Sequence, residues 1–357
     1  MTDPVAASTA LITLPRGRRS ELRATVGGIL RRLGVYVITL WVAVTINFLL
    51  PRLAPGDPTQ RVVAALAQRT GQDVPPATVD AIRAIMGDTD QNLFVQYVGY
   101  LGSILRLDFG VSVSQYPIQV VDVISAAVPW TLYLVVTGTV VSWIIGTGLG
   151  LYAGWRRGSV ADRVISLGSV VTISLPSFWI ALVVLWVFGY TLAWFPNSGA
   201  YDQSLDPGFN SDFIFSVMYY GFLPILTVVL VSFAGWSMSM RNMAAITTLE
   251  DYVLLAKAKG LSPFRVAMAY TGRNAVLPNA TGLAQAIGHS IGGVVLIEIV
   301  YGYPGLGTEL RNAVDTQDLP VMQGIFLLIT IVVLISNFAS DVINGFIDPR
   351  TRQGGKN

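Results

Sequence analysis

Cysteine and charge are what this sequence has least of. It contains no cysteine, which excludes disulfides, thiolate metal sites and cysteine nucleophiles. Only 12% of its 357 residues are Asp, Glu, Lys or Arg, whereas a soluble domain carries about 25%. The chain has one histidine, His289, too few for a histidine-rich metal relay, so we expect no metal site. With 53% hydrophobic residues, this composition indicates an integral membrane protein.

Sequence signatures of catalysis are also missing. The phosphate-loop pattern GxxxxGK[ST] does not occur, and the single Gly-Lys pair, Gly355-Lys356, is followed by Asn357. An intramembrane serine hydrolase with a histidine base would depend wholly on His289 and lacks a GxSxG-type elbow. We therefore expect no catalytic residue and no cofactor in this chain, and no nucleic-acid partner.

Six uncharged runs of 19 to 38 residues stand apart from all others, since the next longest run, 109–121, has 13. A membrane helix needs roughly 20 apolar residues. The 38-residue run is predicted to hold one span, because its tail around Trp194 and Pro196 is typical of an interfacial aromatic cluster followed by a turn. The sequence therefore predicts an all-α membrane protein with six transmembrane helices. The runs are Leu33–Pro51, Val123–Trp155, Val164–Tyr201, Phe213–Met240, Asn274–Ile297 and Leu319–Ser340.

Positive charge predicts the orientation. With six spans both termini lie on one side, and that side carries 17 Lys and Arg residues against 6 on the other. By the positive-inside rule both termini are cytoplasmic. The chain is predicted to begin with a basic cytoplasmic tail at the lipid surface, 1–32, followed by the first helix, 33–50. An extracytoplasmic region, 51–128, leads to the core with helices two to six, 129–347. A cytoplasmic tail, 348–357, ends the chain.

Inside these segments the spacing of residues makes further predictions. Asp90 is predicted to N-cap an amphipathic helix with Phe94, Val98, Leu101 and Leu105 on one face, lying on the membrane, on a partner or in a small outer core. The predicted spans are about Pro129–Tyr152, Val164–Tyr190, Phe222–Met240, Leu277–Val300 and Val321–Ile343.

Small and polar residues mark points in the spans. Gly146, Gly150 and Gly154 form overlapping GxxxG spacings, which allow close helix packing within this chain or with a partner subunit. Ser174 and Ser177 flank Pro176 in the third span, a pattern that predicts a kink whose freed backbone groups find polar partners.

The charged segment Thr247–Pro278 lies between two long apolar runs. Thr247 followed by Glu250 resembles a capping box, and Glu250 with Asp251 places acid in a first helical turn. Cationic Lys257 and Lys259 suit the last turn of the same helix.

A second helix is predicted to follow at once. Gly260 suits the position after a helix end, and Leu261 follows it in the turn. Ser262 is a good N-cap for the next helix, with Pro263 at its first position. Such a helix–turn–helix is either a solvated connector or a docking element for a soluble partner. One stripe of its first helix is predicted to carry Tyr252, Leu255, Ala256 and Lys259.

Polar residues in the fifth span are candidates for a translocation path. Gln285 and His289 lie four residues apart on one face, with Thr281 and Ser290 nearby. Either this face lines the path or it hydrogen-bonds a partner subunit. Glu298, near the outer end, is either an anchor for the following turn or a gate residue. Ser174 and Ser177 complete the candidates.

Several motifs together resemble the peptide-importer branch of the ABC importer permeases. Ala256 and Gly260, in the segment 252–262 followed by 273–278, are similar to the EAA loop of that family. Two departures are Leu254-Leu255, where the general pattern opens with Glu-Ala, and Tyr270 with Gly272. The resemblance also rests on Pro55-Gly56-Asp57-Pro58, Ser174-Leu175-Pro176-Ser177-Phe178-Trp179, and Glu298 with Tyr301-Gly302-Tyr303-Pro304-Gly305-Leu306-Gly307.

The resemblance implies a type I importer permease fold in the cytoplasmic membrane of a prokaryote. It implies a coupling loop at 244–275 that docks on an ATPase. The implied contacts are Glu250, Asp251, Tyr252, Leu255, Ala256, Lys259, Gly260, Leu261, Ser262 and Pro263. The implied partners are a homologous second permease, two ATPase subunits that bind ATP and Mg, an external solute-binding protein and the peptide substrate. Glutathione and nickel complexes are alternative solutes.

An ion-driven secondary transporter is the competing class. It would show intramembrane carboxylates for ion coupling and repeated broken helices, and neither is evident in the sequence.

Overall fold

A computed structural model describes residues 33–49 and 92–347, together with residues 63, 64, 67, 71, 74–76 and 79. The prediction of a helical protein is confirmed, since all named elements are helices. The predicted tails and the motif at 55–58 lie outside the described residues. Besides the helix Leu33–Leu49, the elements are α4 (Leu93–Leu105), α5 (Val120–Trp155), α6 (Val160–Ser174), α7 (Ser177–Val184), η1 (Leu185–Thr191), α8 (Ser211–Thr247), α9 (Asp251–Ala258), α10 (Pro263–Arg265), η2 (Val266–Gly272), α11 (Arg273–Ala275), α12 (Leu277–Tyr301), α13 (Leu306–Asp315) and α14 (Leu319–Ile347).

Four of the described helices, α5, α8, α12 and α14, are long and apolar enough to cross a membrane. The pair formed by α6 and α7 with η1 adds a fifth span if the two arms are taken together. The described helix Leu33–Leu49 is also apolar and, with 17 residues, stands at the lower end of the length range of a span.

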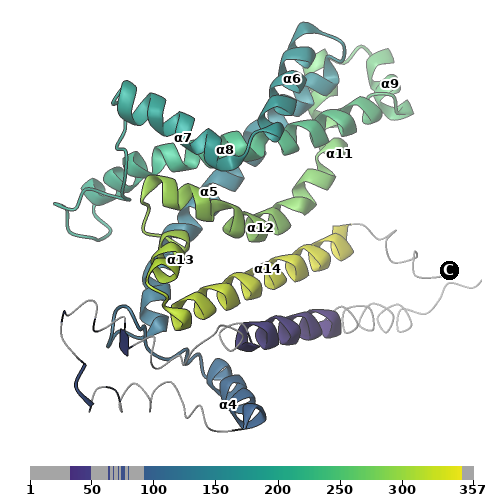
Figure 1. The fold of residues 1–357 in the computed structure, drawn as a ribbon. Helices are drawn as coiled ribbons and strands as arrows, with labels where there is room; N and C mark the ends of the chain where they lie inside the picture. The colour runs from purple at the N-terminus through teal and green to yellow at the C-terminus, as the bar shows by residue number, and fades with distance from the viewer. Residues whose placement is uncertain are drawn as a thin grey trace, which may run out of the picture.

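The helix Leu33–Leu49 lies against α14 in Figure 1. Asn47 and Gln323 each donate a side-chain hydrogen bond to the other's backbone carbonyl, at 2.9 and 2.8 Å. One helical turn from the other end, the Tyr36 hydroxyl donates to Asp341 at 2.9 Å. These reciprocal bonds fix the register of two helices that are almost 300 residues apart in the sequence.

The prediction of a kink at Pro176 is confirmed, but the bend is a break of 106° between α6 and α7. Proline at the N-cap of α7 has an extended backbone, and Leu175 before it is extended as well, which ends α6. Ser174 satisfies its hydroxyl locally by donating to the Val170 carbonyl at 2.8 Å.

Two predicted spans are longer at both ends in the structure. α5 begins at Val120 rather than near Pro129, and Asp122 places acid in its first turn, where the helix dipole favours it. α8 begins at Ser211, capped by Asn210, whose side chain accepts from the Phe213 amide at 2.8 Å. Both helices keep an internal proline, which membrane helices tolerate.

α5 and α8 pack backbone to backbone. A Cβ atom at Gly154 would lie 2.6 Å from the Arg241 carbonyl oxygen, and one at Gly146 would lie 2.7 Å from Trp236 Cβ. Gly150 faces Ser237 and Met240 in the same row. The three glycines therefore face α8 of the same chain, which answers the question of where this GxxxG row packs.

The central apolar core lies where α5, α7, α8 and α12 meet. It contains Leu134, Ala181, Leu223, Ile291 and Val294, all buried. Tyr301, the last residue of α12, is part of the same core, and its hydroxyl contacts the Thr227 hydroxyl at 2.9 Å. This core holds α12, the helix with the polar face, against the α5–α8 pair.

The predicted amphipathic helix is confirmed as α4, but its cap differs from the prediction. Asn92 is the N-cap, and its side chain accepts from the Phe94 amide at 3.0 Å; Asp90 was the wrong residue. Phe94 and Val98 are exposed.

Candidate functional site

The helix α9 is fixed to the end of α5 by a small apolar cluster. Val253 and Ala256 are buried against Val266, with Trp155, Leu261 and Tyr270 packed around them. The Lys257 ammonium lies 5.1 Å from the centre of the Trp155 ring, a cation–π contact between the two helices. α9 is therefore attached to the body of the subunit along one face.

The predicted tight turn after α9 is confirmed. Lys259 is the C-cap, and Gly260 has φ +72°, a left-handed conformation that glycine adopts without strain. The Gly260 amide donates to the Lys257 carbonyl at 2.9 Å, and the Leu261 amide to the Ala256 carbonyl at 3.3 Å. Ser262 is the next N-cap, with Pro263 at the start of α10, as predicted.

The predicted capping box at Thr247 is wrong. Thr247 is the last residue of α8 and is buried, so its backbone is helical rather than extended. The N-cap of α9 is Glu250, with an extended backbone and no side-chain cap bond; Asp251 opens the helix. The local pattern failed because α8 continues past its apolar run to Thr247.

The residues of the predicted stripe on α9 differ in burial. Tyr252, Leu255 and Lys259 are exposed, whereas Ala256 is buried, 2% exposed, against the body of the subunit. Leu254, Leu255, Phe264 and Met268 present large apolar surfaces around the turn. The structure thus separates an attached face from an outward apolar face on the same short helix.

A buried ion pair holds the ends of α6 and α8 together near α9, and Figure 1 shows α6 and α9 at the same end of the molecule. The Arg241 guanidinium donates to both oxygens of Asp162, at 2.5 and 3.0 Å. Asp162 also accepts from the Gly158 amide at 2.8 Å. The sequence analysis did not predict this pair, although Asp162 lies just before the uncharged run 164–201 and Arg241 just after the run 213–240.

The polar face of α12 faces outward from the subunit. Gln285 and His289 are exposed, and the His289 Nδ1 lies 3.1 Å from the Gln285 carbonyl oxygen. Thr281 donates to the Pro278 carbonyl at 3.0 Å, and Ser290 accepts from Thr139 of α5 at 3.2 Å. Gln285 and His289 therefore leave their polar side chains at the surface of an apolar helix.

The candidate residues do not form one cluster. Ser174 and Ser177 stand at the bend between α6 and α7, and no hydrogen bond joins either side chain to the polar residues of α12 within the described residues. α7 meets α12 instead near Tyr301, whose hydroxyl donates to the Ala181 carbonyl at 3.3 Å.

Glu298 is completely buried at the junction of α12 and α13. One of its oxygens accepts from the Gly307 amide at 2.6 Å, whereas its Oε1 has no hydrogen-bond partner among the described residues. Thr131 of α5 accepts from the Leu306 amide at 2.8 Å. The first amides of α13 are thus capped by groups from α12 and α5, which matches the anchor interpretation of Glu298.

Glycine is required in this turn for close approach. A Cβ at Gly307 would lie 2.6 Å from the Val295 backbone and 2.8 Å from a Glu298 oxygen. Tyr303, in the same turn, is buried, and this burial raises the pKa of its phenol above the ordinary value. The α12–α13 junction is therefore packed tightly.

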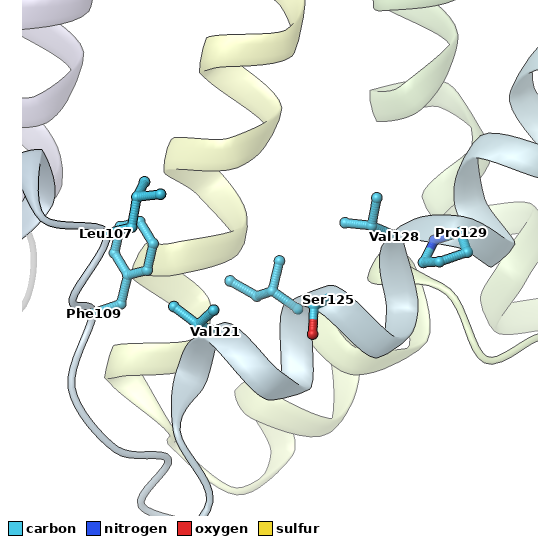
Figure 2. Close-up of a pocket in the computed structure, with 7 residues that line it drawn as sticks. Leu107, Phe109, Val121, Ser125, Val128 and Pro129 are labelled. Carbon is cyan, nitrogen blue, oxygen red and sulfur yellow. The ribbon is translucent and has the colours of Figure 1, made fainter.

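An apolar cavity beside the start of α5 has different chemistry (Figure 2). It is lined by Leu107, Phe109, Val121, Ile124, Ser125, Val128 and Pro129. The Ser125 hydroxyl is already bonded to the Asp122 carbonyl at 3.0 Å. This lining offers little to the polar backbone of a peptide, so the cavity is no candidate for the path.

A bundle of apolar helices, with a helix–turn–helix between two of them, is the architecture of an integral membrane protein with one segment outside the apolar layer. Comparison with known proteins gives the family: residues 146–353 match "Binding-protein-dependent transport system inner membrane component". The chain belongs to this family, whose members are non-catalytic subunits of the inner membrane.

Three relatives cover nearly the whole chain. A putative peptide permease protein of Brucella ovis is 34% identical over 85% of this chain and 92% of its own length. A di/tripeptide transport system permease of Pseudomonas aeruginosa is 30% identical over 91% of this chain and 98% of its own. A glutathione transport system permease of Salmonella typhi is 31% identical, with the same two coverages, 91% and 98%.

Proposed function

We propose that this chain is the permease subunit of an ATP-driven importer that moves peptides across the cytoplasmic membrane by alternating access. The observation that carries the proposal is the helix α9, which is attached by Val253 and Ala256 and presents Leu254 and Leu255 outward. An apolar outward face on a charged segment suits a groove of a soluble partner. The names of the relatives support peptides as the substrate.

The membrane arrangement is part of the proposal. Six spans follow if Leu33–Leu49 crosses together with α5, the α6–α7 pair, α8, α12 and α14. The excess of Lys and Arg on the α9 side supports cytoplasmic termini, the outer region 51–128 and the core 129–347.

We propose four kinds of partner: a homologous second permease, two ATPase subunits, an external binding protein and the peptide itself. ATP and Mg would be bound by the ATPases, because this chain lacks a phosphate loop. The coupling residues would be exposed ones of 250–263, with Leu254 and Leu255 at the centre, Tyr252 and Lys259 beside them, and Glu250, Asp251, Ser262 and Pro263 at the two ends. Ala256, Gly260 and Leu261 would shape the segment rather than touch the ATPase.

In this mechanism nucleotide-driven closure of the ATPases displaces α9, and the attached helices change between inward-open and outward-open states. ATP shifts the equilibrium only by its differential affinity for the two states. Gln285 and His289, with Thr281 at their inner end, are the proposed lining of the path, because they are polar and face outward from the subunit. Glu298 would keep the outer turn in place, and Ser174 and Ser177 would act at the α6–α7 bend.

The proposal is tested by changing the turn after α9. Gly260→Pro is incompatible with φ +72° and removes the amide bond to Lys257, so it should misplace α9. The complete importer is reconstituted in liposomes, and ATP-dependent peptide uptake and ATP hydrolysis are measured. Gly158→Pro is the matched control: Gly158 has φ +83°, lies in another turn at the same end and, like Gly260, donates its amide, in this case to Asp162, so the same change of conformation and loss of one bond is made away from α9.

We expect Gly260→Pro to lose uptake while the complex still assembles and the binding protein still binds peptide, and Gly158→Pro to keep the coupling of uptake to ATP hydrolysis. Unchanged uptake and ATPase activity in an assembled Gly260→Pro complex would mean that the segment is only a connector. Failure of the wild-type complex to take up any peptide with ATP would reject the peptide-importer proposal itself.

Glutathione is a second candidate substrate, supported by the name of one relative. A competition assay with dipeptides, longer peptides, glutathione and nickel complexes separates these solutes. An ion-driven mechanism predicts uptake that follows a proton or sodium gradient without ATP.

A further inference from the structure

Asn279 lies where the segment that carries α9 joins the spans. It is the third residue of α12, just after the short helices η2 and α11, and its side chain is only 1% exposed. An asparagine buried at this depth needs partners for two donors and an acceptor.

The partners of Asn279 come from two other helices. Its Nδ2 donates to the Thr147 hydroxyl of α5 at 3.2 Å and to the Trp236 carbonyl of α8 at 3.1 Å. Its Oδ1 accepts from the Ser239 hydroxyl of α8 at 2.6 Å. Its backbone carbonyl accepts from the Trp143 indole of α5 at 3.1 Å. One residue thus joins α12 to both α5 and α8.

The two helices that Asn279 contacts, α5 and α8, are already packed closely against each other. Gly146, Gly150 and Gly154 bring α5 against the α8 backbone, and the Asp162–Arg241 pair ties α6 to the same end of α8. Asn279 adds α12 to this unit by directional bonds. The neighbouring apolar contacts of Ala275 with Met240 and Ala244 have no preferred direction, so they permit sliding.

We propose that Asn279 is the positioning residue that transmits the displacement of α9 to the membrane helices, and so sets how much peptide is moved per ATP hydrolysed. This inference rests on the proposed function. α9 is attached to Trp155 at the end of α5 and to Val266 of η2. Asn279 closes the other side of this connection, so that η2, α5 and α8 move α12 as one body.

The test uses the complete importer with its ATPases and binding protein in liposomes. Asn279→Ala removes the three side-chain bonds, and the readout is the ratio of peptide imported to ATP hydrolysed. Asn337→Ala is the matched control, because Asn337 lies in the α14 span and its Oδ1 has no hydrogen-bond partner within the described residues. A ratio separates coupling from stability, because loss of folded complex lowers both activities together.

We expect Asn279→Ala to lower the ratio by about tenfold, within the range of about 5- to 150-fold that coupling between sites spans. ATP hydrolysis should persist and respond less to peptide-loaded binding protein, while Asn337→Ala keeps the wild-type ratio. An assembled Asn279→Ala importer with the wild-type ratio would overturn the proposal, and so would an equal loss in Asn337→Ala.

Two milder variants decide the matter if Asn279→Ala does not assemble. Ser239→Ala and Trp143→Phe each remove one hydrogen bond to Asn279. We expect each to lower the ratio by about two- to threefold, a smaller loss than the full coupling range. Wild-type ratios in both would overturn the proposal. Absence of ATP-driven uptake by the wild-type complex would instead reject the proposed function and leave the ratio undefined.

Discussion

Two groups of glycines in this subunit have opposite surroundings. Gly146, Gly150 and Gly154 of α5 lie against the backbone of α8, so closely that a Cβ atom at any of them would overlap α8. Gly292 and Gly293 of α12 have nothing within 4 Å of their Cβ positions. Small residues in a span therefore mark close packing in the first case and an open face in the second.

The difference identifies which faces the fold uses. The three glycines of α5 are in contact with α8 of the same chain. The open glycines of α12 lie on the same side as His289 and Gln285, with the exposed Leu296 beyond them. A GxxxG spacing alone does not distinguish these cases, since Gly288–Gly292 has one glycine of each kind: Gly288 faces Ser336 of α14.

The largest effect on stability is expected from Gly150→Leu, on the closely packed side of the comparison. The added side chain would meet the Ser237 backbone and Met240, so α5 and α8 must separate. We expect a cost above about 3 kcal/mol, the upper end for overpacking, and loss of folded subunit. Thermal unfolding and size-exclusion profiles in detergent measure it. Gly148→Leu, two residues away on the open side of α5, should be tolerated.

A smaller effect is expected from Asp162→Asn, which removes charge from the pair that ties α6 to α8 at the Gly154 end of the same packing. Arg241 keeps a neutral acceptor but loses its counterion, which should lower the free energy of unfolding by about 2 kcal/mol. The control is Asp315→Asn, because Asp315 pairs with Arg311 at 3.5 Å on an exposed surface, where such pairs contribute little. Equal losses of unfolding free energy in the two variants would mean that the Asp162–Arg241 pair contributes no more to stability than an exposed pair.

A pH-dependent effect is expected at α13, whose first turn is held by Glu298 but whose side carries the half-buried Glu309. Burial raises the pKa of Glu309, and hydrogen bonds from Gln115 and Asn312 oppose the shift. A carboxyl with a raised pKa in the folded state binds protons more tightly there than when unfolded. Stability should therefore fall as pH rises from about 4.3 through the raised pKa.

Glu309→Gln should remove this dependence and raise the unfolding temperature slightly at neutral pH. Because the side chain is half exposed, solvent screening keeps the change below about 1 kcal/mol. Unfolding temperatures of wild type and variant between pH 4 and 8 test it, and a variant that becomes less stable at neutral pH would contradict it.

The smallest effect on stability is expected from Gly292→Leu, which makes the same substitution on the open face of α12. The space around this position is open, so the free energy of unfolding of the isolated subunit should stay within about 0.5 kcal/mol of wild type. The assay is the one used for Gly150→Leu. A comparable loss in the two variants would mean that the open face of α12 is packed after all.

Several elements were predictable because their signals are local. The fifth span was predicted at Leu277–Val300 and is α12, Leu277–Tyr301, since charge or turn residues bound its apolar run. The turn at Gly260 and the start at Pro263 followed from the conformational preferences of glycine and proline. The cap of α9 was predicted wrongly because α8 extends through Thr247 and excludes a cap there.

The remaining features depend on residues far apart in the sequence. α13 was not predicted, because its first amides are capped by Glu298 and Thr131 from two other helices. The partners of Asn279 lie 40 and more residues away. The proline alone located the break after α6, but it did not give the angle of 106°.

The length of α5 has a mechanical consequence. Its 36 residues span about 54 Å at 1.5 Å per residue, whereas the hydrocarbon layer is about 30 Å thick. Even tilted by about 40°, the helix still projects about 10 Å beyond that layer in total. The part of this excess at the Trp155 end would place α9 outside the hydrocarbon layer, where a soluble partner reaches it without entering the apolar part of the bilayer.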